Sequence, residues 1–406
     1  MKCLKWYDDE VVDLGESLVR FINCQLLVDD IFVEQDLWVH NGRVIESFDV
    51  FYEEKVDADY CIDCEHLLLA PSFIDLQVKG SSDINLSSDD GDIIEKLRLI
   101  SRRLLKYGVT SFCPTIMSSS PSFYQKILKE YNRYCASDEN AAAILGFHME
   151  GPFISSIKRG CHKRENVLDE FTNGYESIER VYGKHTDDIR MITLAPELPN
   201  ALEVIKELSE RNILVSLGYS NATVTVAHKA VRMGARGITH IFNAMKTFHD
   251  DDMGVAGLLM GPRRSSIYYG LIADGFNCEP AAVKTAYRLC PRGLMLVTNE
   301  AAASYPEGGT VSSTDECDPR EKEINLRMTP VSGFVPMVES VRSLVRYSGC
   351  DCAYALSCAS LHPAKFLGID TVKGSLKPGC DADFLLLSDE LNIVATFIDG
   401  RRVYKY

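Results

Sequence analysis

Residues 190–218 read RMITLAPELPNALEVIKELSERNILVSLG, and this stretch decides the fold. Two short β-rich runs, at 190–196 and 213–218, flank a segment whose apolar residues recur at three- and four-residue spacing. That spacing is typical of an amphipathic helix with one face on a core. The stretch therefore predicts a strand, a helix and a second strand in immediate succession, which is the repeating unit of a parallel α/β fold.

The same alternation continues in both directions along the 406-residue chain. Six further β-rich runs, separated by helical segments, lie near 72–78, 110–116, 143–149, 237–242, 266–273 and 293–298. Alternation repeated eight times indicates a closed barrel rather than an open sheet. We therefore predict the α/β class, with a (β/α)8 TIM-type barrel over residues 71–372.

The two ends of the chain differ from the predicted barrel, because 18–70 and 373–406 read as short strands and turns. Neither piece has enough strands to close a core alone. We expect residues 1–70 and 373–406 to combine into one small β-sandwich that docks on the barrel.

Charge and composition exclude several classes of partner. The formal charge of −15 at pH 7 would repel nucleic acids and anionic membranes, so we expect neither as a partner. No run of about 18 apolar residues predicts a transmembrane helix, and acidic residues near the N-terminus argue against a signal peptide. We predict a cytoplasmic protein with reduced cysteines, and we interpret Cys61 and Cys64 as ordinary thiols rather than a zinc site.

In a barrel of this type, active groups lie at the carboxyl ends of the strands. Candidate side chains at the predicted ends are Lys79, Glu150, Tyr219, His240, Asp274, Asn277 and Asn299. A carboxylate and imidazoles that converge on a barrel mouth would suit a divalent metal ion that activates water.

Several segments follow the predicted strands in order, and together they carry a resemblance to a known family. They are HMEGPFIS (148–155), APEL (195–198), GYSNAT (218–223), THIFNAM (239–245), IADG (272–275) and LVTNEA (296–301), followed by SLHPAKFLG and KGSLKPGCDADF near the C-terminus. In order and spacing they resemble the signature segments of N-acetylglucosamine-6-phosphate deacetylases. The resemblance implies an amidohydrolase barrel with a zinc-type divalent metal, usually a homodimer. It also implies an amino-sugar phosphate substrate, hydrolysed to glucosamine 6-phosphate and acetate in amino-sugar catabolism.

The resemblance implies that Glu150 and His240 are metal ligands, with Tyr219 at the position of a second histidine ligand. A tyrosine ligates metal as a phenolate, and its ordinary pKa of about 10 makes that form costly. Tyr219 is therefore either a weak ligand or an ordinary hydrogen-bonding residue, and we favour the second. Two good ligands then remain where catalytic zinc sites have three.

Asn299 stands at the position of the family's catalytic acid/base aspartate, in TNE instead of TDA. Loss of a general acid/base typically costs ~10²–10⁴ in rate. The neighbouring Glu300 is not expected to replace it, because adjacent strand residues point to opposite faces.

The family's substrate contacts are partly kept. His162, Asn243 and Ala244 match residues that contact the sugar, whereas Asn277 replaces a substrate-binding histidine. Asp251 stands where the family has a phosphate-binding arginine, so an attraction becomes a repulsion.

Lys79 has two interpretations. The family commonly carries Gln-x-Asn at the end of the first barrel strand, and this chain has Gln77-x-Lys79. If Lys79 points inward, its ammonium would neutralise Glu150 and replace the charge of a metal ion. Alternatively, it is a solvent-facing lysine in a strand-end loop.

Two functions follow from these substitutions. One is a deacetylase with an altered site, slow or shifted in substrate. The other is a pseudoenzyme that keeps the barrel to bind a sugar or a partner. Losses that affect metal, acid/base, sugar and phosphate groups together favour the second for the standard reaction.

Overall fold

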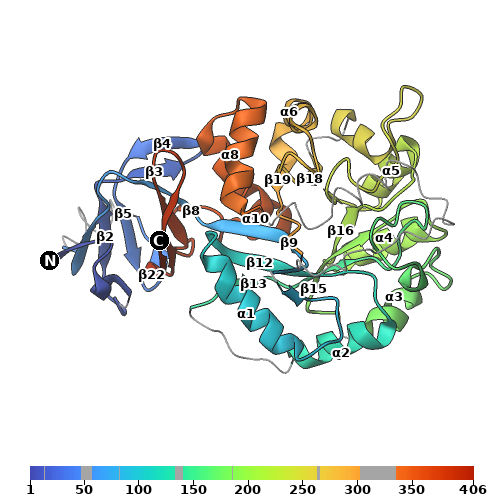
Figure 1. Cartoon of the computed structure of the whole chain (residues 1–406), viewed down its shortest axis with the longest axis horizontal. Coiled ribbons are helices and arrows are strands. Elements are labelled where there is room, and N and C mark those ends of the chain that lie inside the picture. Colours follow the sequence, from blue (N-terminus) through green and yellow to red (C-terminus); the bar gives the residue numbers. More distant parts are fainter. Residues whose placement is uncertain are drawn as a thin grey trace.

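The computed structural model describes residues 1–12, 14–46, 57–81, 83–132, 140–184, 186–262, 266–301 and 335–406. Its architecture is a parallel strand barrel surrounded by helices, beside a pair of sheets built from both chain ends (Figure 1). The predicted α/β class, the barrel and the sandwich from both ends are confirmed.

Eight parallel strands in the described ranges form the barrel wall in sequence order. They are β9 (Phe73–Val78), β12 (Val109–Ile116), β14 (Phe147–Glu150), β15 (Ile189–Leu194), β16 (Leu214–Leu217), β17 (Gly237–Ile238), β18 (Tyr268–Leu271) and β19 (Leu294–Leu296). A parallel bridge between Val78 and Glu300 brings the chain after β19 back to β9, which nearly closes the barrel. Each strand overlaps one predicted run. The run at 143–149 divides into β13 (Ala143–Ile144) and β14, because Gly146 between them adopts a positive φ of 106°.

Helices cover the outside of the barrel (Figure 1). They are α1 (Ile93–Leu105), α2 (Pro121–Asn132), α3 (Glu176–Tyr182), α4 (Ala201–Glu210), α5 (Val224–Arg232), α6 (Pro280–Leu289), α8 (Met337–Ser348), α9 (Cys352–Ser357) and α10 (Leu361–Leu367). Short 3-10 turns are η1 (Asp9–Val12), η3 (Arg164–Asn166), η4 (Gly254–Met260) and η6 (Pro291–Gly293). The opening stretch explains this packing, since α4 buries Ala201, Val204, Ile205 and Leu208 at helical spacing.

The sandwich consists of a five-stranded and a six-stranded sheet. The first contains β1 (Lys2–Lys5), β7 (Tyr60–Asp63), β2 (Val19–Ile22), β5 (Leu37–His40) and β6 (Arg43–Val44). The second contains β22 (Arg401–Lys405), β21 (Ile393–Ile398), β20 (Phe384–Leu387), β8 (Leu68–Pro71), β3 (Gln25–Val28) and β4 (Ile31–Glu34). β20 pairs antiparallel with β8, which joins the two chain ends in one sheet. Phe21 of the first sheet packs edge-on against Phe384 of the second, with ring centroids 5.0 Å apart.

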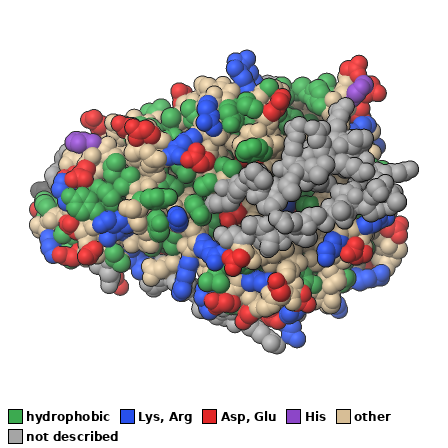
Figure 2. Space-filling view, viewed as in Figure 1, with side chains coloured by type: hydrophobic (Ala, Val, Ile, Leu, Met, Phe, Trp, Pro, Cys, Tyr) green, Lys and Arg blue, Asp and Glu red, His purple; other side chains and the backbone are tan. Residues whose placement is uncertain are grey.

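Acidic and basic side chains are interspersed over the face seen in Figure 2. Within the described ranges, no helix is long and apolar enough to cross a membrane.

Candidate active site

Strand β9 and the residue that follows it place three polar side chains inside the barrel. Asp75, Gln77 and Lys79 are two residues apart and therefore share one face, and all three are buried. Asp75 accepts a hydrogen bond from the Thr298 hydroxyl at 2.5 Å. Higher in the barrel, Gln77 Nε2 donates to Glu150 Oε1 at 2.7 Å, and Lys79 Nζ lies 2.8 Å from Glu150 Oε2. The structure thus places Lys79 inside the mouth of the barrel.

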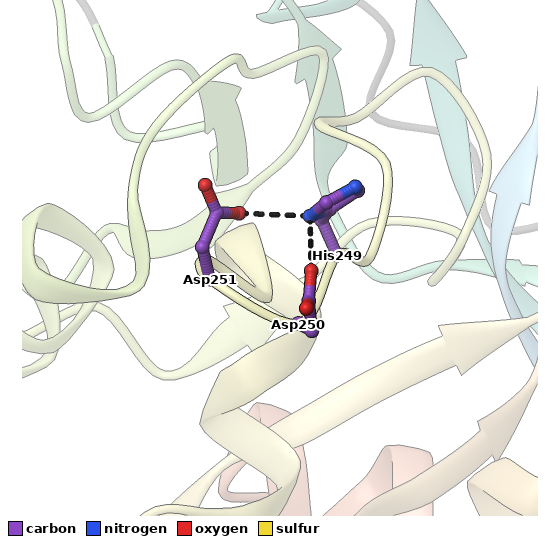
Figure 3. A group of neighbouring side chains, drawn as sticks. All are labelled: His249, Asp250 and Asp251. Atoms are coloured by element: carbon purple, nitrogen blue, oxygen red, sulfur yellow. Dashed lines mark hydrogen bonds and ion pairs between the residues drawn. The ribbon is translucent and has the colours of Figure 1, made fainter.

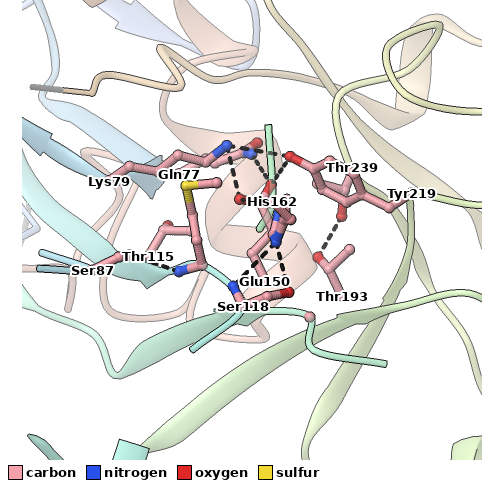
Figure 4. A network of polar contacts seen from close by, with 12 residues as sticks. Gln77, Lys79, Ser87, Thr115, Ser118, Glu150, His162, Thr193, Tyr219 and Thr239 are labelled. Atoms are coloured by element: carbon pink, nitrogen blue, oxygen red, sulfur yellow. Dashed lines mark hydrogen bonds and ion pairs between the residues drawn. The ribbon is translucent and has the colours of Figure 1, made fainter. Parts of the chain in front are cut away.

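Glu150, the last residue of β14, is the centre of a buried polar cluster (Figure 4). Besides Gln77, the Tyr219 hydroxyl donates to Oε1 at 2.9 Å, and His240 Nε2 lies 3.3 Å from the same oxygen. Lys79 Nζ also donates to the Tyr219 hydroxyl oxygen at 3.4 Å. Side chains from the ends of three other strands, β9, β16 and β17, therefore converge on one carboxylate.

The backbone at three of these strand ends is unusual. Tyr219, His240 and Asn299 have φ values of 48°, 30° and 53°, in a region that non-glycine residues rarely adopt. Such conformations cluster at active sites and ligand clamps, where the surrounding structure holds them. The positions matched to the family's chemistry are thus also positions of backbone strain.

His162 reaches the same cluster from the loop after β14. Its Nδ1 accepts a hydrogen bond from the Ser118 backbone N–H at 3.1 Å, and burial lowers the pKa of the imidazole to about 3. The ring is therefore neutral, with its proton on Nε2, which lies 3.9 Å from Glu150 Oε2. Its ring also packs edge-on against Tyr219, with centroids 4.4 Å apart.

Opposing influences set the ionisation of Glu150. Burial is the largest and acts to raise the pKa, but the charge of Lys79 and the hydrogen bond from His240 act against it. The net effect holds the pKa of Glu150 well below its ordinary value. Glu150 is therefore a carboxylate whose counter-charge comes from the protein itself.

A second group links the ends of β17 and β18. The Asn277 side-chain amide donates to Asp274 Oδ2 at 2.6 Å, and its backbone N–H donates to Asp274 Oδ1 at 2.7 Å. Asn243 Nδ2 donates to the backbone carbonyl of Asn277 at 3.1 Å. Ala244 packs against Tyr219, which connects this group to the Glu150 cluster.

Two predicted site residues form no described hydrogen bond with these groups. The Oδ1 atom of Asn299 is buried and has no hydrogen-bond partner among the described residues. Asp251 is on an exposed loop, where Oδ1 lies 2.9 Å from His249 Nδ1, and Asp250 approaches the same nitrogen at 2.6 Å (Figure 3). Its side chain is 83% exposed, so its described contacts place it on the surface rather than in the Glu150 cluster.

The atoms around Glu150 do not fit a zinc-type ion. A metal ion binds lone pairs and brings positive charge, whereas Gln77 and Tyr219 present hydrogens to Oε1 and the Lys79 ammonium already lies 2.8 Å from Oε2. Across the described residues, the one trio of metal-type side chains with ligand atoms within 4.8 Å of one another is His249, Asp250 and Asp251 on the surface. Glu150 and His240 therefore lack a third described ligand of this kind.

Two residues of the site, Gln77 and Ser118, were not among the predicted site residues. The two-residue periodicity of β9 is the signal that could have identified Gln77. Ser118 orients His162 from the loop after β12. No motif marks Ser118, because its role comes from a contact with a residue 44 positions away.

Comparison with known proteins agrees with this architecture. Residues 68–403 match the amidohydrolase family, which defines the class of barrel. N-acetylglucosamine-6-phosphate deacetylase of Homo sapiens is 39% identical over 401 residues, covering 96% of this chain and 97% of the relative. The protein of the same name from Danio rerio is 39% identical over 394 residues, with the same coverage of both chains.

Solved structures agree as well. The crystal structure of N-acetylglucosamine-6-phosphate deacetylase from Pasteurella multocida superimposes with a TM-score of 0.79 at 26% identity, covering 96% of this chain and all of the other. The chain therefore belongs to the amidohydrolases and, within them, to the N-acetylglucosamine-6-phosphate deacetylase family.

Proposed function

We propose that this chain is a member of the deacetylase family that binds an amino-sugar phosphate but hydrolyses its acetamide far more slowly than its relatives, or not at all. Relatives at 39% identity carry the name of the deacetylase, which supports the class of ligand. The loss of hydrolysis is a feature of this chain's own residues.

One observation carries the proposal: the protein itself engages both oxygens of Glu150. Oε1 accepts hydrogen bonds from Gln77 and Tyr219, and Oε2, which accepts no hydrogen bond from the described residues, forms an ion pair with the Lys79 ammonium at 2.8 Å. A carboxylate whose charge is already neutralised by an ammonium attracts a divalent ion less strongly. Asn299 also removes the acid/base group, because a carboxamide does not exchange a proton with water or an amine as a carboxylate does.

Other groups of the mouth support retained binding. His162 Nε2 is buried and has no hydrogen-bond partner in the described residues, so its N–H is available to a ligand oxygen. Burying an unpaired donor costs about 1–3 kcal/mol, which a ligand oxygen would recover. Asn243 and Ala244, which match the family's sugar contacts, lie beside Tyr219 and Asn277.

Acetate release from N-acetylglucosamine 6-phosphate tests the proposal, with the human relative assayed in parallel and zinc supplied to both. We expect turnover lower by at least ~10²–10⁴, the cost of losing a general acid/base. Calorimetry with the same ligand should still show binding, weakened by His162→Ala. Turnover comparable to that of the relative would refute the loss of hydrolysis, and absence of binding would refute the retained site.

A further inference from the structure

The backbone of Lys79 is fixed at the seam that closes the barrel. Its N–H donates to the Glu300 carbonyl at 2.7 Å, beside the bridge that joins Val78 to Glu300. Its own carbonyl accepts from the Leu86 N–H at 3.0 Å, across the short hairpin of β10 (Gly80–Ser81) and β11 (Ile84–Asn85). Hydrogen bonds on both sides therefore fix the backbone from which the Lys79 side chain extends.

The ammonium at the end of this side chain is buried with its partner. Side-chain exposure is 4% for Lys79 and 0% for Glu150. Removing one member of such a pair leaves the other as an uncompensated buried charge, which is strongly destabilising.

The Lys79 ammonium is also the nearest of the basic groups around Glu150. In the described part of the chain, the groups in ion-pair range of Glu150 are Lys79 at 2.8 Å, His240 at 3.3 Å and His162 at 3.9 Å. Lys79 is the one among them that is not a histidine.

We propose that Lys79 is the resident cation of this site, and that its ammonium excludes a divalent metal from Glu150. The proposal deepens the proposed function, on which it rests, by making the barrel mouth independent of metal. It also explains why Tyr219 can replace the family's histidine ligand. A site whose carboxylate is neutralised by a lysine does not require a third metal ligand. The direct consequence is that restoring a ligand at Tyr219 leaves the site closed to metal while Lys79 remains.

Metal content of full-length variants tests this consequence. Each variant carries His249→Ala, because the exposed trio of His249, Asp250 and Asp251 would otherwise hold adventitious zinc. In that background we compare the parent, Tyr219→His, Lys79→Asn, and Tyr219→His combined with Lys79→Asn. After dialysis against zinc, the combined variant should retain about one ion per chain, since it then offers three protein ligands. The parent and Tyr219→His should retain far less.

Thermal unfolding provides a second readout that does not involve activity. The melting temperature of the parent should not change with zinc or a chelator, whereas that of the combined variant should rise with zinc and fall with chelator. Adding Glu150→Gln to the combined variant is the matched control. It removes a ligand without leaving a buried charge, so the zinc response should disappear.

Zinc retention by Tyr219→His alone, at the level of the combined variant, would overturn the proposal. So would a folded combined variant that holds no zinc, or a parent whose melting temperature rises with zinc. If Lys79→Asn does not fold, the Tyr219→His variant still tests the proposal: zinc retention at about one ion per chain would overturn it, and retention no higher than that of the parent would support it. Deacetylation by the wild type, by contrast, would refute the proposed function. The role of Lys79 would then still be tested by the metal content of these variants.

Discussion

Glu150 and Glu300 are two buried carboxylic acids at the mouth of one barrel, and they differ in their polar partners. For Glu150, burial is the largest influence, but the charges of Lys79 and His240 together with the hydrogen bond from His240 outweigh it and keep the pKa of the group low. For Glu300, burial raises the pKa to about 8, against a weaker opposing hydrogen bond from Ser81. Their exposures, 0% and 3%, are nearly the same.

The difference shows that neighbouring partners, rather than depth alone, decide the charge of a carboxyl group here. Lys79, directly after β9, contacts both residues in different ways. Its ammonium lies at Glu150, whereas its backbone N–H donates to the carbonyl of Glu300. Its charge lowers the pKa of Glu150, and burial without a described ion pair of this kind raises that of Glu300.

Removing the Lys79–Glu150 ion pair and restoring the family's residues around it should have its largest effect on turnover. We predict that replacing Lys79→Asn, Tyr219→His, Asn277→His, Asn299→Asp and Asp251→Arg together raises zinc-dependent acetate release at least ~10²-fold. The reason is that these groups act on one step, so single reversals recover little. Acetate assays with N-acetylglucosamine 6-phosphate measure the gain.

The matched control for this experiment keeps Lys79 and carries the other four substitutions. Its acetate release should not exceed that of the wild type, because the ammonium still lies at Glu150. Equal activity of the two variants would show that Lys79 does not limit the site.

A smaller effect is expected on stability. Lys79→Met should lower the free energy of unfolding by about 3–5 kcal/mol, because Glu150 would then be a buried charge without a counter-charge. Lys79→Met combined with Glu150→Gln should cost less than Lys79→Met alone, since no charge remains. Guanidinium chloride denaturation at neutral pH, with a chelator present, measures both. Additive losses would contradict the coupling of the pair.

The smallest effect concerns Glu300 and pH. The folded protein keeps a proton on Glu300 up to about pH 8, whereas the unfolded chain releases it near 4.5. Stability should therefore fall as pH rises through this window, by up to about 1.4 kcal/mol per pH unit from this group. Glu300→Gln should reduce the slope of the free energy of unfolding against pH. Denaturation midpoints at three pH values about one unit apart, between about pH 5.5 and 7.5, measure this slope. Glu165→Gln, at an exposed carboxylate, should leave the slope unchanged, and an equal slope in both variants would contradict the assignment.

The sequence by itself determined the barrel, the sandwich from both ends and the strand ends at which polar side chains gather. These features follow from local periodicities: alternation in strands and three-four spacing in helices, as in residues 190–218. The resemblance also marked the substituted positions, since each lies in a contiguous segment such as GYSNAT.

Tertiary structure alone decided which of those side chains meet. Lys79 and Glu150 are 71 positions apart (150 − 79), and a lysine at a strand end can point inward or outward with no difference in local pattern. Strands β9 and β14 pair with opposite edges of β12, which brings the buried carboxylate within reach of the ammonium just after β9. Asp251 shows the opposite outcome, because its loop projects it into solvent although it matches a binding position. A long, flexible side chain takes its direction from the charges that the fold places around it, and those charges come from distant parts of the chain.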